Sequence, residues 1–150
     1  MPQSLAVNLI HLVFSTKNRK PLLVETVRPE LFAYQAGVLE KWNSPALRIG
    51  GEADHVHILF RLSKNYPLSK VVEEVKKSSS KWMKTRIASN ADFAWQNGYA
   101  AFSVSQSRVS DVERYIQQQP DHHRAASFRE ELRLLLRRHG LEYDERYLWD

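Results

Sequence analysis

One stretch of alternating residues, from His55 to Leu62, constrains the fold more than any other part of the sequence. Its even positions carry Val, Ile, Phe and Leu, whereas its odd positions begin with the histidines His55 and His57. Because successive side chains of a β-strand point to opposite faces, the pattern predicts a strand with one apolar face and two adjacent imidazoles on the other. Paired imidazoles on a strand can hold a metal ion, but they are more often incidental polar residues. The spacing alone leaves both interpretations open.

The residues around this strand predict the rest of a sheet. Residues 5–14 are apolar on both faces, which is typical of a central strand, and His11 within them is expected to be a hydrogen-bonded polar group of the sheet. The pair Gly50–Gly51 is expected to join the histidine strand to a preceding strand as a hairpin. The remaining helices and strands of this part are predicted over residues 27–42, 46–49, 67–87 and 98–105.

Two further helices are predicted after the last strand. Capping boxes begin at Ser110 and Ser127, and Gly140 is expected to end the second helix. The resulting order of elements predicts an α+β fold, in which an antiparallel sheet has helices on one face and two more helices follow it. In this arrangement the two histidines lie on the exposed face of the sheet.

Composition excludes several classes of protein. The 150 residues contain no cysteine, which excludes disulfide scaffolds, cysteine-ligated zinc and thiol catalysis, and their number is typical of one domain. A signal peptide and a membrane-spanning apolar run are both missing from the sequence, so a cytoplasmic location is expected. Lysine and arginine exceed aspartate and glutamate by 22 − 17 = 5, a balance that fits a polyanionic partner.

Positive charge is concentrated in an early loop and on the second predicted helix. Such charges usually form an ordinary solvated face, but here they are mostly of one sign, which also suits contacts with a phosphate backbone. The residues predicted to contact DNA are Lys17, Arg19, Lys76, Lys77, Lys81 and Lys84.

Tyr115 and Gln119 are four residues apart on a predicted helix and are therefore expected to lie on one of its faces. A tyrosine hydroxyl is a weak nucleophile unless its target is activated, and a metal ion can activate a phosphate by polarising an oxygen. Together with His55 and His57, the Gln119 carbonyl offers a mixed set of nitrogen and oxygen ligands, which suits Mg²⁺ or Mn²⁺. The alternative is that Tyr115 belongs to the core and Gln119 to the surface.

In these features the sequence resembles the single-tyrosine HUH transposases, insertion-sequence enzymes that move single-stranded DNA and are related to REP-associated tyrosine transposases. The resemblance covers nearly the whole chain, and it is specific in the joint order and spacing of its motifs. These are His55–Val56–His57, Tyr115 with Gln119, residues 14–19, residues 95–105, and His122–His123 ahead of Phe128.

The resemblance implies a ferredoxin-like fold, a single HUH transposase domain over residues 1–150, and a homodimer that binds DNA hairpins at the ends of an element. It implies that His55, His57 and Gln119 bind Mg²⁺ or Mn²⁺. Tyr115 would attack the scissile phosphate of single-stranded DNA and form a 5′-phosphotyrosine link, and a different 3′-OH would reverse the reaction and rejoin strands. In this family the tyrosine helix is often donated by the partner subunit, so the site would be completed in trans.

Pro120 departs from the family's pattern. It directly follows Gln119, and a residue that precedes proline is driven away from helical angles, so either a hinge or a weaker third ligand is expected there. In the second case His122 or His123 would replace Gln119. Two other functions remain open: a catalytically silent domain that binds single-stranded nucleic acid, and a metal-dependent hydrolase that uses water.

Overall fold

A four-stranded antiparallel sheet in the order β2-β3-β1-β4 is the centre of the fold. The structure is a computed structural model that describes residues 2–86, 91–123 and 126–150. The strands are β1 (Asn8–Ser15), β2 (Ala46–Gly51), β3 (His55–Leu62) and β4 (Ala100–Val104). The predicted hairpin of β2 and β3 is present, and His57 on β3 lies between Gly50 of β2 and Val13 of β1.

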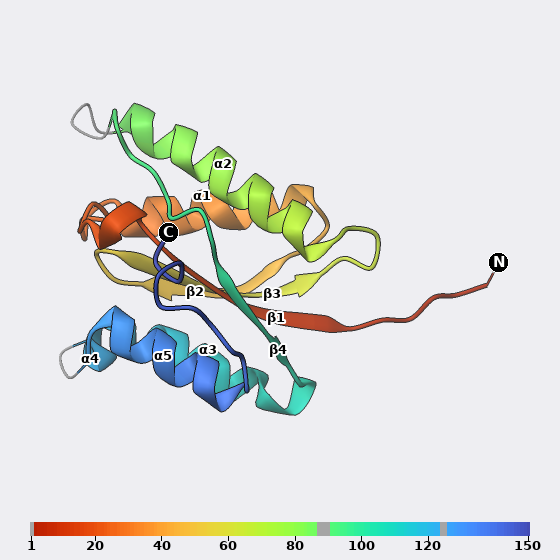
Figure 1. Cartoon of the computed structure of the whole chain (residues 1–150). Coiled ribbons are helices and arrows are strands. Elements are labelled where there is room, and N and C mark those ends of the chain that lie inside the picture. The colour runs from red at the N-terminus through yellow and green to blue at the C-terminus, as the bar shows by residue number, and fades with distance from the viewer. Residues whose placement is uncertain (1, 87–90, 124–125) are drawn as a thin grey trace.

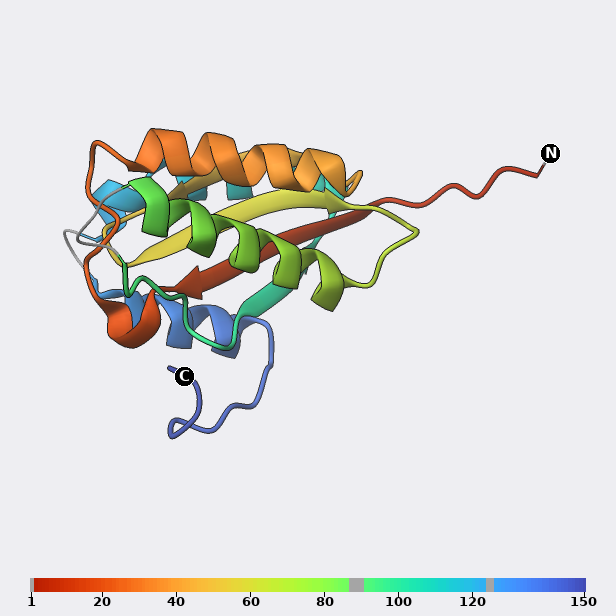
Figure 2. The ribbon, with the colours of Figure 1, turned by 90° about the horizontal axis from the view of Figure 1, so that it is seen from above.

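Helices α1 (Arg28–Lys41) and α2 (Leu68–Arg86) cover one face of this sheet, as Figures 1 and 2 show. The alternation predicted for β3 is confirmed, because Val56, Ile58 and Phe60 are fully buried in the core beneath these two helices. Ile87, which was predicted to end the second helix, lies outside the described residues. In the part of the chain that the structure describes, no helix has the length and apolar character needed to cross a membrane.

The opposite face of the sheet is also covered (Figure 1), by α3 (Val109–Gln117), the short α4 (Gln119–His122) and α5 (Phe128–Arg138). The prediction that the two histidines lie on an exposed face is therefore wrong, and both are fully buried. The reason is a second apolar cluster, in which α5 packs against the sheet; its members are Val13, Phe102, Phe128, Leu132, Leu135 and Leu136.

Of the two predicted helix caps, the one at Ser127 is present and the one at Ser110 is not. Ser127 caps α5, since its hydroxyl accepts a hydrogen bond from the Glu130 amide at 3.2 Å, and Gly140 follows the helix with a φ of 65°. The capping box at Ser110 is not used. A 3₁₀ turn, η3 (Gln106–Arg108), runs directly into α3, so Ser110 lies inside that helix. A similar turn, η1 (Lys17–Arg19), follows β1.

Candidate active site

A buried carboxylate from α5 occupies the centre of the histidine face. Glu131 Oε1 lies 3.0 Å from His57 Nε2 and 3.5 Å from His55 Nε2. Its other oxygen, Oε2, accepts hydrogen bonds from the Gln119 amide at 2.8 Å and from the Tyr115 hydroxyl. One carboxylate therefore connects the paired histidines to the tyrosine.

The residues at this centre fit a divalent cation. His55, His57 and Glu131 are all buried, and each offers one ligand atom, with these atoms lying within 4.8 Å of one another. The Gln119 carbonyl oxygen lies 2.9 Å from His55 Nε2 and adds a fourth donor. Two imidazole nitrogens with carboxylate and amide oxygens form a mixed set that transition and borderline divalent metals accept.

Both histidines have a partner on the ring nitrogen that faces away from this centre. His55 Nδ1 lies 2.8 Å from an Asp54 carboxylate oxygen, and His57 Nδ1 lies 2.8 Å from Nε2 of His11. Such outer partners orient metal-binding imidazoles and determine which nitrogen is free to bind. The prediction that His11 is a hydrogen-bonded polar group of the sheet is confirmed, and its partner is one of the paired histidines.

Burial and the central carboxylate set the charges of the site. Burial lowers the pKa of His57, and burial together with His57 lowers the pKa of His11 to about 3, so both rings are neutral at pH 7. Burial acts to raise the pKa of the Glu131 carboxyl, but hydrogen bonds from His123 and His57 outweigh it and hold that pKa well below its usual range. Burial and the Glu131 charge raise the pKa of the Tyr115 hydroxyl, which is therefore a neutral phenol.

Tyr115 and Gln119 do not share one continuous helix, contrary to the prediction from their spacing. Helix α3 ends at Gln117, and a new helix begins at Gln119 with Pro120 in its first turn, where proline is favourable. The break does not remove Gln119 from the site, since this side chain is fully buried and contacts Glu131 and His55. Pro120 therefore interrupts the helix without removing Gln119 from the centre, and a hinge at this point stays a prediction.

The two histidines after Pro120 have different places. His123 Nε2 lies 3.2 Å from Glu131 Oε1 and 2.9 Å from the Gln119 carbonyl oxygen, so it reaches the centre alongside Gln119. The ring of His122 instead packs on the ring of Tyr115, with their centroids 4.7 Å apart. His123 is therefore the one of this pair that could supply a further donor.

The position of the tyrosine depends on close packing between α3 and β2. Ile116, the neighbour of Tyr115, lies against Gly50, where an added Cβ would be only 2.7 Å from the Ile116 carbonyl oxygen. Only glycine permits this approach, and it brings Tyr115 over His57, with ring centroids 5.7 Å apart. The tyrosine, the paired histidines and Glu131 meet within the chain that the structure describes.

Several of the predicted DNA-binding residues surround a groove between α2 and the segment before β4. This groove has a volume of about 400 Å³, and its lining includes Lys76, Lys77, Lys84, Trp95 and Tyr99. Lys77 and Lys84 are exposed there, whereas the Lys76 ammonium donates hydrogen bonds to three backbone carbonyls, those of residues 96, 97 and 98.

The other three predicted residues lie outside the lining of this groove. Lys17 is close to it, because its backbone amide donates to the Ala94 carbonyl at 2.9 Å, and Arg19 lies over the Trp149 ring at 5.3 Å. Lys81 is exposed elsewhere on α2. A DNA contact by any of the six stays a prediction.

Glu131 is the member of the site that the sequence interpretation missed. Its position carried a signal, because residues 128, 131, 132, 135 and 136 form the buried stripe of α5 and Glu131 is the one acidic member of that stripe. A charged residue on the apolar face of an amphipathic helix is rarely buried without partners. What the sequence does not reveal is which face of the sheet this stripe covers.

Comparison with known proteins places these features in context. A family model described as "Transposase IS200 like" matches residues 6–119. A crystal structure of a Deinococcus radiodurans protein assigned as a transposase has a TM-score of 0.62 at 20% identity, over 79% of this chain and 98% of that one. A REP-associated tyrosine transposase bound to a REP hairpin has a TM-score of 0.61 at 15% identity, over 82% of this chain and 72% of that one. No curated protein sequence matches the chain. The two structures confirm the predicted α+β fold.

Proposed function

This chain belongs to the family of IS200-like transposases, as the resemblance predicted, and on that premise we propose that it cleaves and rejoins single-stranded DNA through a 5′-phosphotyrosine intermediate. The observation that carries the proposal is the double role of the Glu131 carboxylate. One oxygen faces His55 and His57, and the other accepts the hydrogen bond of the Tyr115 hydroxyl. A prospective metal site and a prospective nucleophile therefore share one side chain.

In the proposed cleavage step, the Tyr115 oxygen attacks the scissile phosphorus. A bond forms between that oxygen and phosphorus, and the bond between phosphorus and the 3′-oxygen breaks. The phenol gives up its proton to solvent, and the 3′-oxygen takes up one proton from solvent and leaves as a 3′-OH. Glu131 Oε2 accepts the hydrogen bond of the Tyr115 hydroxyl and so positions the nucleophile, while the lowered pKa of this carboxyl keeps it ionised. Attack by a different 3′-OH reverses these steps and joins a new strand without an external source of energy.

The buried donors are proposed to hold Mg²⁺ or Mn²⁺, with His55, His57 and Gln119 as predicted and with Glu131 added. A bound divalent cation would polarise a phosphate oxygen and offset negative charge in the transition state. The chain's own contribution is to orient the ligands, through Asp54 and His11, and to keep the His57 imidazole neutral at pH 7.

The proposed substrate is DNA with hairpins at the ends of a mobile element. Support comes from the REP hairpin bound in one of the similar structures and from the excess of positive charge on this chain. Exposed Lys77 and Lys84 beside Tyr99 offer phosphate contacts and an aromatic face in one groove, whose wall also contains the buried Trp95. Completion of the site by the tyrosine helix of a partner subunit stays a prediction. The homodimer stays a prediction, which the oligomeric state in solution would test.

The test is a denaturing gel of purified protein incubated with single-stranded DNA from both flanks of its gene, with and without Mn²⁺. The proposal expects a metal-dependent protein–DNA band that survives heat and SDS and is lost in Tyr115→Phe and His57→Ala. Tyr143→Phe is the matched control, because Tyr143 is an exposed tyrosine of the tail, and it is expected to keep the band. Retarded DNA without a covalent band would indicate the silent binding domain, and cleaved DNA without an adduct would indicate the hydrolase.

A further inference from the structure

Tyr115 forms part of the wall of two cavities. One, of about 340 Å³, is lined by Tyr115 together with Glu131 and His123, and it belongs to the site already described. The other, of about 410 Å³, is lined by residues of β4, α3 and α5 and by His11, and we call it the Phe102 cavity. The two cavities share Tyr115, Leu135 and Arg138. The proposed nucleophile thus lies between a cavity that contains the proposed ligand Glu131 and a cavity with no role so far.

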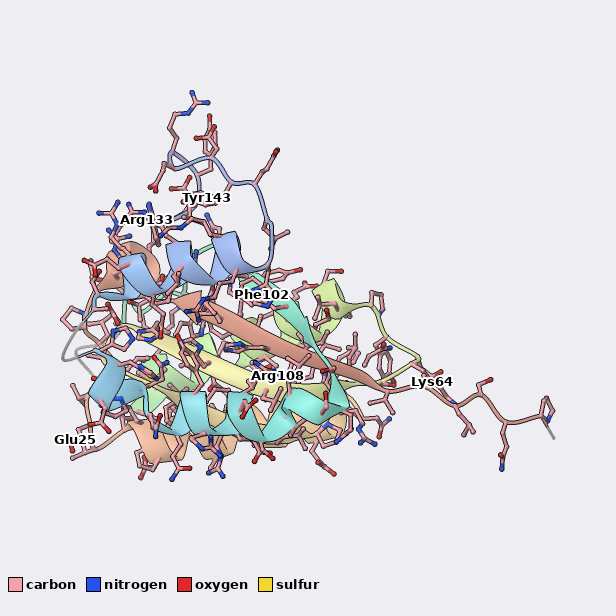
Figure 3. The ribbon with its side chains drawn as sticks, turned by 90° about the horizontal axis from the view of Figure 1, so that it is seen from below. Glu25, Lys64, Phe102, Arg108, Arg133 and Tyr143 are labelled. Carbon is pink, nitrogen blue, oxygen red and sulfur yellow. The ribbon has the colours of Figure 1, made fainter. Side chains whose placement is uncertain are left out.

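The walls of the Phe102 cavity are rich in flat rings. Phe102 and His139 stack on each other with centroids 4.2 Å apart, and the rings of His11 and Tyr115 meet edge to face at 6.1 Å. Figure 3, which looks onto this face of the sheet, labels Phe102 in the region between α5 and α3. Phe102 and His11 are buried in this wall, whereas His139 is exposed and offers a ring on which a base of single-stranded nucleic acid can stack.

Charged and polar groups complete the cavity. Arg108 and Arg138 line it and are exposed to solvent, which suits guanidinium groups that bind phosphate. Arg138 lines both cavities together with Tyr115, and its charge acts to lower the pKa of the hydroxyl against the larger opposing effects of burial and Glu131. The hydroxyls of Ser103 and Ser105 can bond to the edge of a base, and the Asp111 carboxylate lies 3.3 Å from the Arg108 guanidinium.

We infer that the Phe102 cavity is a nucleotide subsite, which holds the base next to the scissile phosphate of single-stranded DNA while Arg138 binds the phosphate beside Tyr115. The inference rests on the proposed function and extends it by naming where the substrate strand lies. The volume is within the range of about 300–1000 Å³ that small-ligand pockets have. In this arrangement the strand passes over Tyr115, with one nucleotide in each of the two cavities.

Binding in EDTA tests the subsite without any strand cleavage. The four deoxynucleoside 5′-monophosphates are titrated into ¹⁵N-labelled protein, and amide shifts are followed by NMR. At least one of them is expected to shift the amides of residues 102–105 and 112, and Arg138→Gln is expected to abolish these shifts. Arg137→Gln is the matched control, because Arg137 is an exposed arginine one residue away that lines neither cavity. The inference would be overturned if the amide shifts were confined to the groove between α2 and the segment before β4. It would also be overturned if both arginine variants lost the shifts equally.

Fluorescence anisotropy with labelled single-stranded DNA from the gene's flanks gives a second, independent measurement. Val112→Trp fills the cavity and is expected to weaken DNA binding roughly 5- to 150-fold, the value of one stacked base. Arg138→Gln is expected to weaken DNA binding within the same range, whereas the DNA affinity of Arg137→Gln is expected to stay within about twofold of the wild-type value. Unchanged affinity in Arg138→Gln, an exposed position whose substitution leaves the fold intact, would refute the subsite. Because neither measurement involves a covalent bond to Tyr115, failure of the tyrosine mechanism would be visible separately, as bound DNA that never forms an adduct.

Discussion

Substitution of Gly50 by alanine tests whether the packing of α3 on the sheet sets the reactivity of Tyr115. A Cβ at this position would lie 2.7 Å from the Ile116 carbonyl oxygen and 2.8 Å from Ile116 Cγ2. Ordinary contact begins near 3.4 Å, so the backbone beside Tyr115 must move by about 3.4 − 2.7 = 0.7 Å. The substitution therefore displaces the nucleophile without touching its chemistry.

The size of this displacement gives the expected effects. Overpacking of a buried contact costs about 1–3 kcal/mol of unfolding free energy. A misplacement of about 1 Å can cost roughly 100-fold in rate, so about 0.7 Å is expected to slow adduct formation roughly 10- to 30-fold. Affinity for Mn²⁺ is expected to fall less than the rate, because three of the four proposed donors, His55, His57 and Glu131, lie on β3 and α5, and only Gln119 follows α3.

Rates from quenched denaturing gels, Mn²⁺ affinity from calorimetry and stability from urea titration measure these three effects. Gly37→Ala is the matched control: Gly37 lies inside α1, where an added Cβ meets nothing within 4 Å. It is expected to raise stability by about 0.5–1 kcal/mol and to leave the rate unchanged. Wild-type rate and stability in Gly50→Ala would refute the reasoning. So would a loss of Mn²⁺ binding as large as the loss of rate, which would mean that the whole site, and not the tyrosine, had moved.

Three further predictions follow from single residues. Glu131→Gln removes the charge of a proposed ligand and is expected to weaken Mn²⁺ binding, measured by calorimetry. Loss of a residue that only orients a ligand costs about 10- to 100-fold in metal affinity, so the loss here is expected to be at least as large. Unchanged affinity would exclude Glu131 as a ligand. His11 has a pKa of about 3 in the folded protein and 6.5 in the unfolded chain, so the unfolded chain takes up the proton first as the pH falls. Lowering the pH from 7 to 5.5 is therefore expected to reduce the free energy of unfolding of the metal-free protein by about 1 kcal/mol through this residue. Urea titrations should find this loss reduced in His11→Asn, and an equal pH dependence in both proteins would contradict it. Ser127→Ala removes the cap of α5 and is expected to lower the free energy of unfolding by about 1 kcal/mol in the same assay. An unchanged free energy of unfolding would mean that this cap does not stabilise the helix.

Local patterns in the sequence predicted the framework of this fold well. Period-2 alternation in residues 55–62 is a physical requirement of a strand with one face in the core, so Val56 and Ile58 were placed correctly without any tertiary information. The cap at Ser127 and the turn at Gly140 are likewise contacts within a few residues of the chain. Such features depend on neighbours that the sequence itself supplies.

The site depended on contacts that no local pattern contains. Nothing near His55 indicates that α5, more than sixty residues later, packs onto its face of the sheet, and that docking buries the paired histidines. The same docking brings Glu131 between His57 and Tyr115, so the central carboxylate was missed although its place on an apolar stripe was visible. Pro120 was recognised as a break, but only the tertiary structure shows that Gln119 reaches the centre in spite of it.

Peptide mapping of the covalent protein–DNA product tests the central claim most directly. The protein is incubated with single-stranded DNA from its gene's flanks and Mn²⁺, digested with protease and nuclease, and analysed by tandem mass spectrometry. The account predicts a nucleotide joined through its 5′-phosphate to the peptide that contains Tyr115, and a free 3′-OH on the released strand. A nucleotide on any other tyrosine, a link through a 3′-phosphate, or cleaved DNA with an unmodified Tyr115 peptide would contradict it.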